Sequence, residues 1–143
     1  MEAFITLDCG NCLENTVELL KIFQRIGWEI HNPQGEIEFL PLGDKDEYNW
    51  QCEKMSEKQF YDIVLEKISC KEMIGVNLFY QDGKEGISLL AYNTNQITLD
   101  ISINRRIISG KHTDMIWYLK NIIYKFFDEG ISAISYKLEE FED

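Results

Sequence analysis

A strict alternation of apolar and polar side chains between residues 97 and 104 restricts most strongly how this chain can fold. The apolar positions are Ile97, Leu99, Ile101 and Ile103, and the polar positions between them are Thr98, Asp100, Ser102 and Asn104. Successive side chains of a β-strand point to opposite faces, so the pattern predicts a strand with one apolar face and one solvated face. Such strands are typical of antiparallel sheets that carry helices on one side only.

Six further segments have the composition of strands. They are Phe4–Leu7, Glu36–Leu40, Tyr48–Cys52, Val76–Tyr80, Ile87–Tyr92 and Ile131–Leu138. Turn-forming residues at Asp82-Gly83 and from Asn93 to Gln96 connect three consecutive strands, and this predicts a meander that ends with the alternating segment. The polar residues Glu139–Asp143 are expected to fray at the end of the chain.

Three segments are predicted to be helices. Asn15 can cap the first, which carries apolar residues at helical spacing and ends at Gly27. Ser56 and Gln59 form a capping box at the start of the second helix. The third spans Met115–Phe127 and also has apolar residues at helical spacing.

The predicted elements occur in the order βα-ββ-α-βββ-αβ. This order indicates an α+β fold with a mainly antiparallel sheet of about six to seven strands and three helices packed on one of its faces. The 143 residues match the common size of one domain, and we predict a single domain over residues 1–143.

The net charge limits the classes of partner that this chain can bind. Its 25 acidic and 14 basic side chains give a formal charge of −11. A field of this sign repels phosphate backbones and attracts cationic partners, so we predict a protein partner and no direct nucleic-acid ligand. The alternative is that the excess charge serves only solubility.

The sequence has no continuous apolar stretch of membrane-spanning length, and Met1-Glu2-Ala3-Phe4 lacks the basic start of a signal peptide. We therefore expect a cytoplasmic protein that does not act at a membrane. In that compartment its four cysteines are expected to be reduced thiols.

The segment Cys9-Gly10-Asn11-Cys12 is a CxxC motif between a predicted strand and a predicted helix. It resembles the redox motif of thioredoxin-like proteins, in which the helix start lowers the thiol pKa. Here, however, the helix is expected to begin near Asn15, and no proline is suitably placed beside the motif. A thiol redox protein that uses Cys9 and Cys12 stays an alternative hypothesis, as does a regulatory domain that binds a small molecule.

Other sequence signals for catalysis or metal binding are incomplete. A zinc site needs four ligands, and Cys52 and Cys70 are isolated in the sequence. The acidic run that begins at Asp44 lacks the glycine of a calcium loop, and Met55 stands where its glutamate should be. His31 and His112 are candidate bases that we expect to face solvent. We predict no cofactor, no metal and no enzymatic activity.

The most informative loop places acidic residues beside aromatic ones. Its five candidate partner-binding residues are Asp44, Asp46, Glu47, Tyr48 and Trp50. Tyr and Trp supply contact area at low entropic cost, and acidic neighbours suit a basic partner. The alternative interpretation is that Trp50 faces the core and that the carboxylates form a solvated turn.

In its general character the chain resembles the small acidic immunity proteins that bacteria make against polymorphic and contact-dependent growth-inhibition toxins. The resemblance rests on the opening strand Phe4–Leu7, the helix from Asn15 to Gly27, and loops rich in Trp, Tyr, Asp and Glu. It implies stoichiometric inhibition of a toxin domain, often a basic nuclease, by covering its active site or a nearby surface. It assigns no role to an individual residue.

Overall fold

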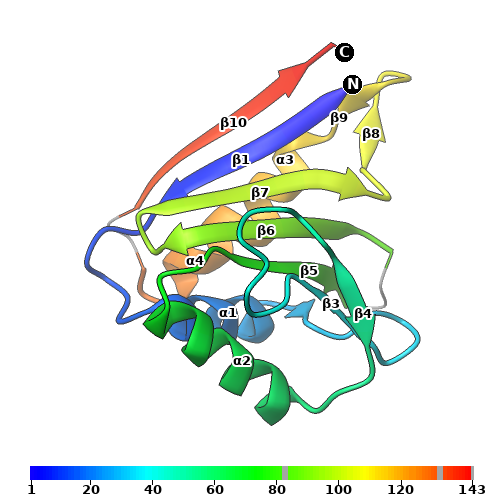
Figure 1. Cartoon of the computed structure of the whole chain (residues 1–143). Helices are drawn as coiled ribbons and strands as arrows, with labels where there is room; N and C mark the ends of the chain where they lie inside the picture. Colours follow the sequence, from blue (N-terminus) through cyan, green and yellow to red (C-terminus); the bar gives the residue numbers. More distant parts are fainter. Residues whose placement is uncertain (82–83, 132–133, 143) are drawn as a thin grey trace.

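An eight-stranded antiparallel sheet forms the centre of the computed structural model, which describes residues 1–81, 84–131 and 134–142. Its path runs β10-β1-β7-β6-β5-β3-β4 (Figure 1), and β2 pairs with β5 beside this path. The strands are β1 (Glu2–Asp8), β2 (Trp28–Glu29), β3 (Ile37–Phe39), β4 (Gln51–Glu53), β5 (Ile74–Tyr80), β6 (Gly86–Asn93), β7 (Gln96–Ile103) and β10 (Ser135–Phe141). A separate hairpin consists of β8 (Ile107–Ile108) and β9 (His112–Thr113).

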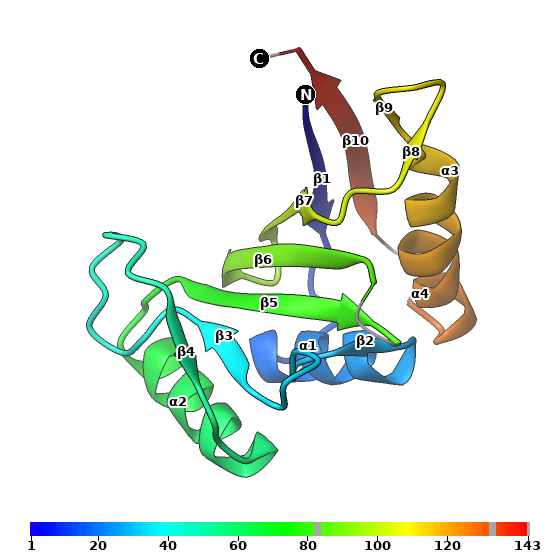
Figure 2. The same ribbon diagram turned by 90° about the vertical axis from the view of Figure 1, so that its right-hand side faces the viewer.

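The helices pack against one face of this sheet and leave much of the other face uncovered (Figure 2). They are α1 (Thr16–Arg25), α2 (Glu57–Ser69) and a third helix made of α3 (Met115–Tyr118), the π-helical η1 (Leu119–Ile123) and α4 (Tyr124–Asp128). The Asn15 side chain caps α1, and Ser56 and Gln59 form the predicted capping box of α2. The predicted α+β class with a mainly antiparallel sheet is therefore confirmed.

The register of β7 follows from its alternating sequence. Ile97, Leu99 and Ile101 are buried against the helices, whereas Ser102 is exposed on the opposite face. Ile103 is only half-buried, because it lies at the strand end. The predicted meander is present as β5, β6 and β7, which pair in sequence order.

Two strand predictions were wrong in their limits. The strand expected to start at Tyr48 begins at Gln51, and the preceding residues belong to a loop in which Tyr48 has a left-handed φ of 58°. The final strand does not end at Leu138 with a frayed tail: it continues to Phe141, which pairs with Glu2 of β1. Ile131 is buried but precedes the strand, and residues 132–133 lie outside the described residues.

Hydrogen bonds to Asn121 join the π-helical turn η1 to β2 and β5. The indole N–H of Trp28 donates to the Asn121 carbonyl (3.1 Å), and the Asn121 side chain donates to the Trp117 carbonyl (2.8 Å). The Tyr80 hydroxyl in turn donates to the Asn121 side-chain oxygen (2.9 Å). Phe127 is exposed, although helical spacing placed it on the apolar face.

Candidate functional site

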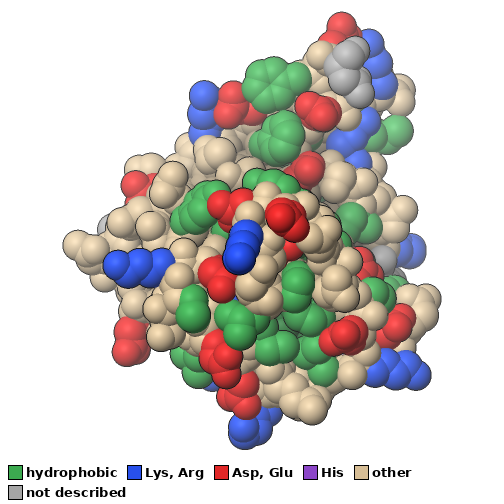
Figure 3. Space-filling model, viewed as in Figure 1, with side chains coloured by type: hydrophobic (Ala, Val, Ile, Leu, Met, Phe, Trp, Pro, Cys, Tyr) green, Lys and Arg blue, Asp and Glu red, His purple; other side chains and the backbone are tan. Residues whose placement is uncertain are grey.

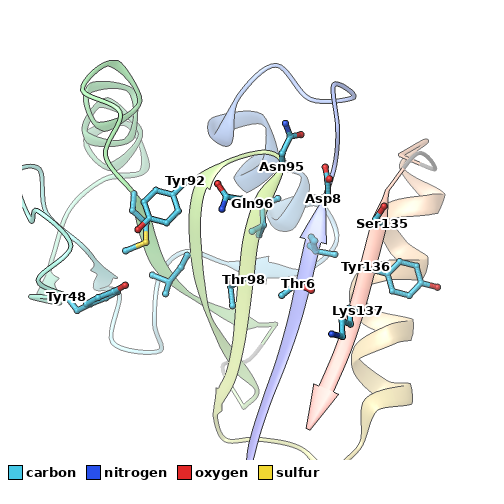
Figure 4. A pocket seen from close by; sticks show the side chains of 14 residues that line it. Thr6, Asp8, Tyr48, Tyr92, Asn95, Gln96, Thr98, Ser135, Tyr136 and Lys137 are labelled. Carbon is cyan, nitrogen blue, oxygen red and sulfur yellow. The ribbon is translucent and has the colours of Figure 1, made fainter. Parts of the chain in front are cut away.

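The sheet face opposite the helices, here called the open face, contains a trough of about 540 Å³ (Figure 4). Its floor includes a row of four side chains on adjacent strands, in the order Lys137, Thr6, Thr98 and Leu90. These residues are direct partners in the antiparallel ladders, so their side chains project from the same face. Tyr48 lies at the side of the trough opposite β10, and it is the one residue of the loop 41–50 that lines the trough.

Residues 41–50, here called the wall loop, are folded around the side chain of Asp44. This carboxylate is buried, and its two oxygens accept the backbone N–H groups of Tyr48 (3.0 Å) and Asn49 (2.8 Å). The Asp44 carbonyl also accepts the N–H of Glu47 (3.2 Å). Charge-assisted bonds of this kind are stronger than neutral ones. The structure thus places Asp44 inside the loop, where its hydrogen bonds fix the loop shape and its carboxylate is shielded from solvent.

A buried lysine of α2 holds the beginning of the wall loop. Lys67 is only 1% exposed, and its ammonium group donates to the carbonyls of Leu40 (2.9 Å) and Pro41 (3.0 Å). Burial lowers the pKa of this ammonium group, while the nearby carboxylates of Glu72, Asp44 and Asp46 act in the opposite direction. This contact could not be predicted from the sequence, because a lysine near the end of an amphipathic helix is ordinarily expected to face solvent.

The other four predicted site residues point into solvent. Tyr48 is 51% exposed and Trp50 is 37% exposed, and both Asp46 and Glu47 are exposed. The alternative in which Trp50 faces the core is therefore wrong. Lys45 and Asp46, like Tyr48, have left-handed backbones, with φ of 54° and 57°. Non-glycine residues hold this conformation only where surrounding contacts enforce it.

One contact joins the wall loop to the sheet. The hydroxyl oxygen of Tyr92, an exposed residue of β6, lies 3.4 Å from the Asp46 carboxylate. The charge of Asp46 is the main cause that raises the pKa of Tyr92. Figure 3 shows hydrophobic side chains interspersed with Asp and Glu across this side of the molecule, with Lys and Arg mainly toward its margins. The surface therefore combines aromatic contact area with negative charge.

Asp100 adds a half-buried carboxyl group to the middle of the open face. It lies opposite Phe4 of β1 and Ser88 of β6 in the ladders. Burial raises its pKa, and the charge of Glu2 raises it further. Within the part of the chain that the structure describes, no hydrogen bond or ion pair involves this carboxyl group. A cation brought to the open face would therefore stabilise its ionised form.

The two CxxC cysteines have different environments. Cys9 is fully buried at the end of β1, whereas Cys12 is exposed. Burial, with smaller contributions from Cys12 and Asp8, raises the pKa of the Cys9 thiol to about 11. A redox-active cysteine needs the opposite shift, because the thiolate is the reactive form. The helix that could lower this pKa starts only at Thr16, so the geometry does not favour thiol chemistry.

Both histidines make structural contacts. His31 is half-buried, with its Nε2 atom 3.0 Å from the Met55 carbonyl, so the expectation that it faces solvent was wrong. The His112 Nδ1 atom lies 2.8 Å from the Glu140 carboxylate. Among residues 1–81, 84–131 and 134–142, no group of His, Cys, Asp and Glu could hold a metal ion, and no helix there is long and apolar enough to cross a membrane.

The open-face residues that sequence reasoning missed are Tyr92, Lys137 and Leu90. The alternation within each strand indicates which side chains share a face, but only the strand order brings them together. Comparison with family models, curated proteins and solved structures gave no match to this chain.

Proposed function

We propose that this protein is a non-catalytic binding protein that neutralises a basic protein partner, as an immunity protein neutralises its toxin. The observation that carries the proposal is the conformation of the wall loop. Asp44 and Lys67 hold this loop by hydrogen bonds, and it presents Trp50 to solvent and Tyr48 at the side of the trough. A loop held in one conformation loses little entropy on binding, so its exposed aromatic residues can act as anchors.

Electrostatics supports a cationic partner. The chain carries a net charge of −11, and Asp46 and Glu47 are exposed next to the aromatic anchors. Long-range attraction accelerates the encounter, and close carboxylates then pair with Lys or Arg side chains of the partner. In a nuclease these are the side chains that hold phosphates, so covering them would block substrate binding. Inhibition of this kind is stoichiometric and needs no catalytic residue.

The test uses the product of the gene adjacent to this one, which should arrest growth when it is expressed alone and should not do so when the two proteins are co-expressed. Binding kinetics then compare wild type with Asp46→Asn/Glu47→Gln and, as a control with the same change of charge, Asp62→Asn/Asp128→Asn. All four positions are exposed, but the control positions lie on α2 and α4.

The loop variant should associate more slowly than the control, and its association rate should depend less on salt, because exposed charges are screened beyond about 8 Å at physiological ionic strength. Trp50→Ala should mainly accelerate dissociation and should cost about 2 kcal/mol or more of binding free energy. Equal rates and equal salt dependence for the two charge variants would show that the wall loop is not the interface. A basic protein of unrelated fold serves as the specificity control and should bind weakly to every variant.

A second candidate function follows from the trough itself. Its volume of about 540 Å³ lies within the range of small-molecule sites, which is about 300–1,000 Å³. A metabolite panel screened by thermal shift would test this candidate. A ligand whose stabilising effect is lost on Thr98→Trp, which fills the floor of the trough, would favour a regulatory domain over the immunity role.

A further inference from the structure

The strand β10 lies at one edge of the sheet. All seven of its residues pair with β1 in one continuous register, and β1 is its only strand partner within the described residues. Figure 1 shows β10 as the outermost strand at that end of the sheet. Edge strands are usually guarded by a proline, a bulge, short length or charged side chains, and β10 has only the last of these, at Lys137, Glu139 and Glu140. β10 contains no proline and no bulge, and it is longer than β4 at the opposite edge, which has three residues.

We propose that β10 pairs with β10 of a second copy of this chain, which would give a homodimer with one continuous sheet. The basis is the charge pattern about Leu138, because an antiparallel pair centred on this residue sets Lys137 of each copy opposite Glu139 of the other. In the single chain the exposed Lys137 and the half-buried Glu139 already form an ion pair of 3.3 Å. The dimer would therefore bring together four charges of alternating sign on the open face.

Charge also selects this register over its neighbours. A twofold axis perpendicular to the sheet keeps both helix layers on one side and pairs residues that project from the same face. A pair centred on Lys137 would set lysine opposite lysine, and a pair centred on Glu139 would set glutamate opposite glutamate. Like charges directly opposite one another destabilise a ladder, whereas opposite charges stabilise it. Of these three registers, only the one centred on Leu138 has two favourable pairs.

The arrangement has a consequence for the open face. Lys137 lies both at the centre of the proposed contact and at the edge of the trough. The open faces of the two copies would look in the same direction, so the two troughs would lie on one surface. A contact of two seven-residue strands is about 23 Å long and buries little area, so the dimer is expected to be weak and concentration-dependent. This inference does not depend on the proposed function.

The experiment is sedimentation equilibrium on the full chain at concentrations up to about 1 mM, where an association of about 4 kcal/mol is half-complete. Wild type should dimerise. Lys137→Glu and Glu139→Lys should each weaken the dimer at least tenfold, because two attractive pairs become repulsive. The double variant Lys137→Glu/Glu139→Lys exchanges the two charges and should recover wild-type association.

A mixture of the two single variants provides the sharpest comparison. One copy then carries two glutamates and the other two lysines, so they should form a heterodimer although neither associates with itself. Thermal melting of each variant checks that the fold is retained. The proposal is overturned if wild type stays monomeric throughout the range, if the single variants dimerise as wild type does, or if the mixture fails to associate.

Discussion

Replacement of Lys67 by methionine tests whether the buried ammonium group fixes the wall loop. The substitution keeps the length and apolar stem of the side chain but removes the donor to the carbonyls of Leu40 and Pro41. Each buried acceptor that loses its partner costs about 1–3 kcal/mol. Removing a buried charge that is expensive to desolvate offsets part of this cost. We therefore expect the free energy of unfolding to fall by about 2 kcal/mol.

The measurement is urea unfolding followed by circular dichroism, with Lys58→Met as the matched control. Lys58 lies on the same helix, but its side chain is 85% exposed and forms only a surface ion pair with Asp62. Such pairs contribute about 0–1 kcal/mol, so the control should unfold close to wild type. If Lys67→Met and Lys58→Met have the same midpoint, the ammonium group does not stabilise the loop and the reasoning is refuted.

Three further outcomes follow from the fold. Ile101→Ala should cost about 2–5 kcal/mol in chemical unfolding and Ser102→Ala less than about 0.5 kcal/mol, whereas equal losses would contradict the register of β7. Hydrogen bonds from Thr113 and His112 of β9 lower the pKa of Glu140 from 4.5 to about 2. The stabilising contribution of the Glu140 carboxylate is therefore present above pH 4.5 and is lost as the pH falls toward 2. Glu140→Gln should make the free energy of unfolding less dependent on pH in that window. Alkylation at pH 8 followed by mass spectrometry should modify Cys12 and spare Cys9 until the protein unfolds, and rapid labelling of Cys9 would contradict its raised pKa.

The local elements of this fold are encoded by short-range chemistry that the sequence displays directly. Alternation predicts β7 and its buried face, because strand geometry forces side chains to opposite sides. The caps at Asn15 and Ser56 predict where α1 and α2 begin, because both bond to backbone groups only three residues away. The composition of the wall loop likewise indicates Tyr48 and Trp50 as candidate contact residues, and both are exposed in the structure.

The long-range contacts were decided only in the tertiary structure. The strand order puts β1 between β7 and β10, and this pairing extends β10 through residues that look like a polar tail. In the sequence Asp44 looks like one more surface carboxylate, but the loop closes around it. Lys67 donates hydrogen bonds to carbonyls that lie more than 25 residues away in the chain. Local patterns record the preference of a residue for water or apolar surroundings, whereas these contacts depend on which distant groups reach it after folding.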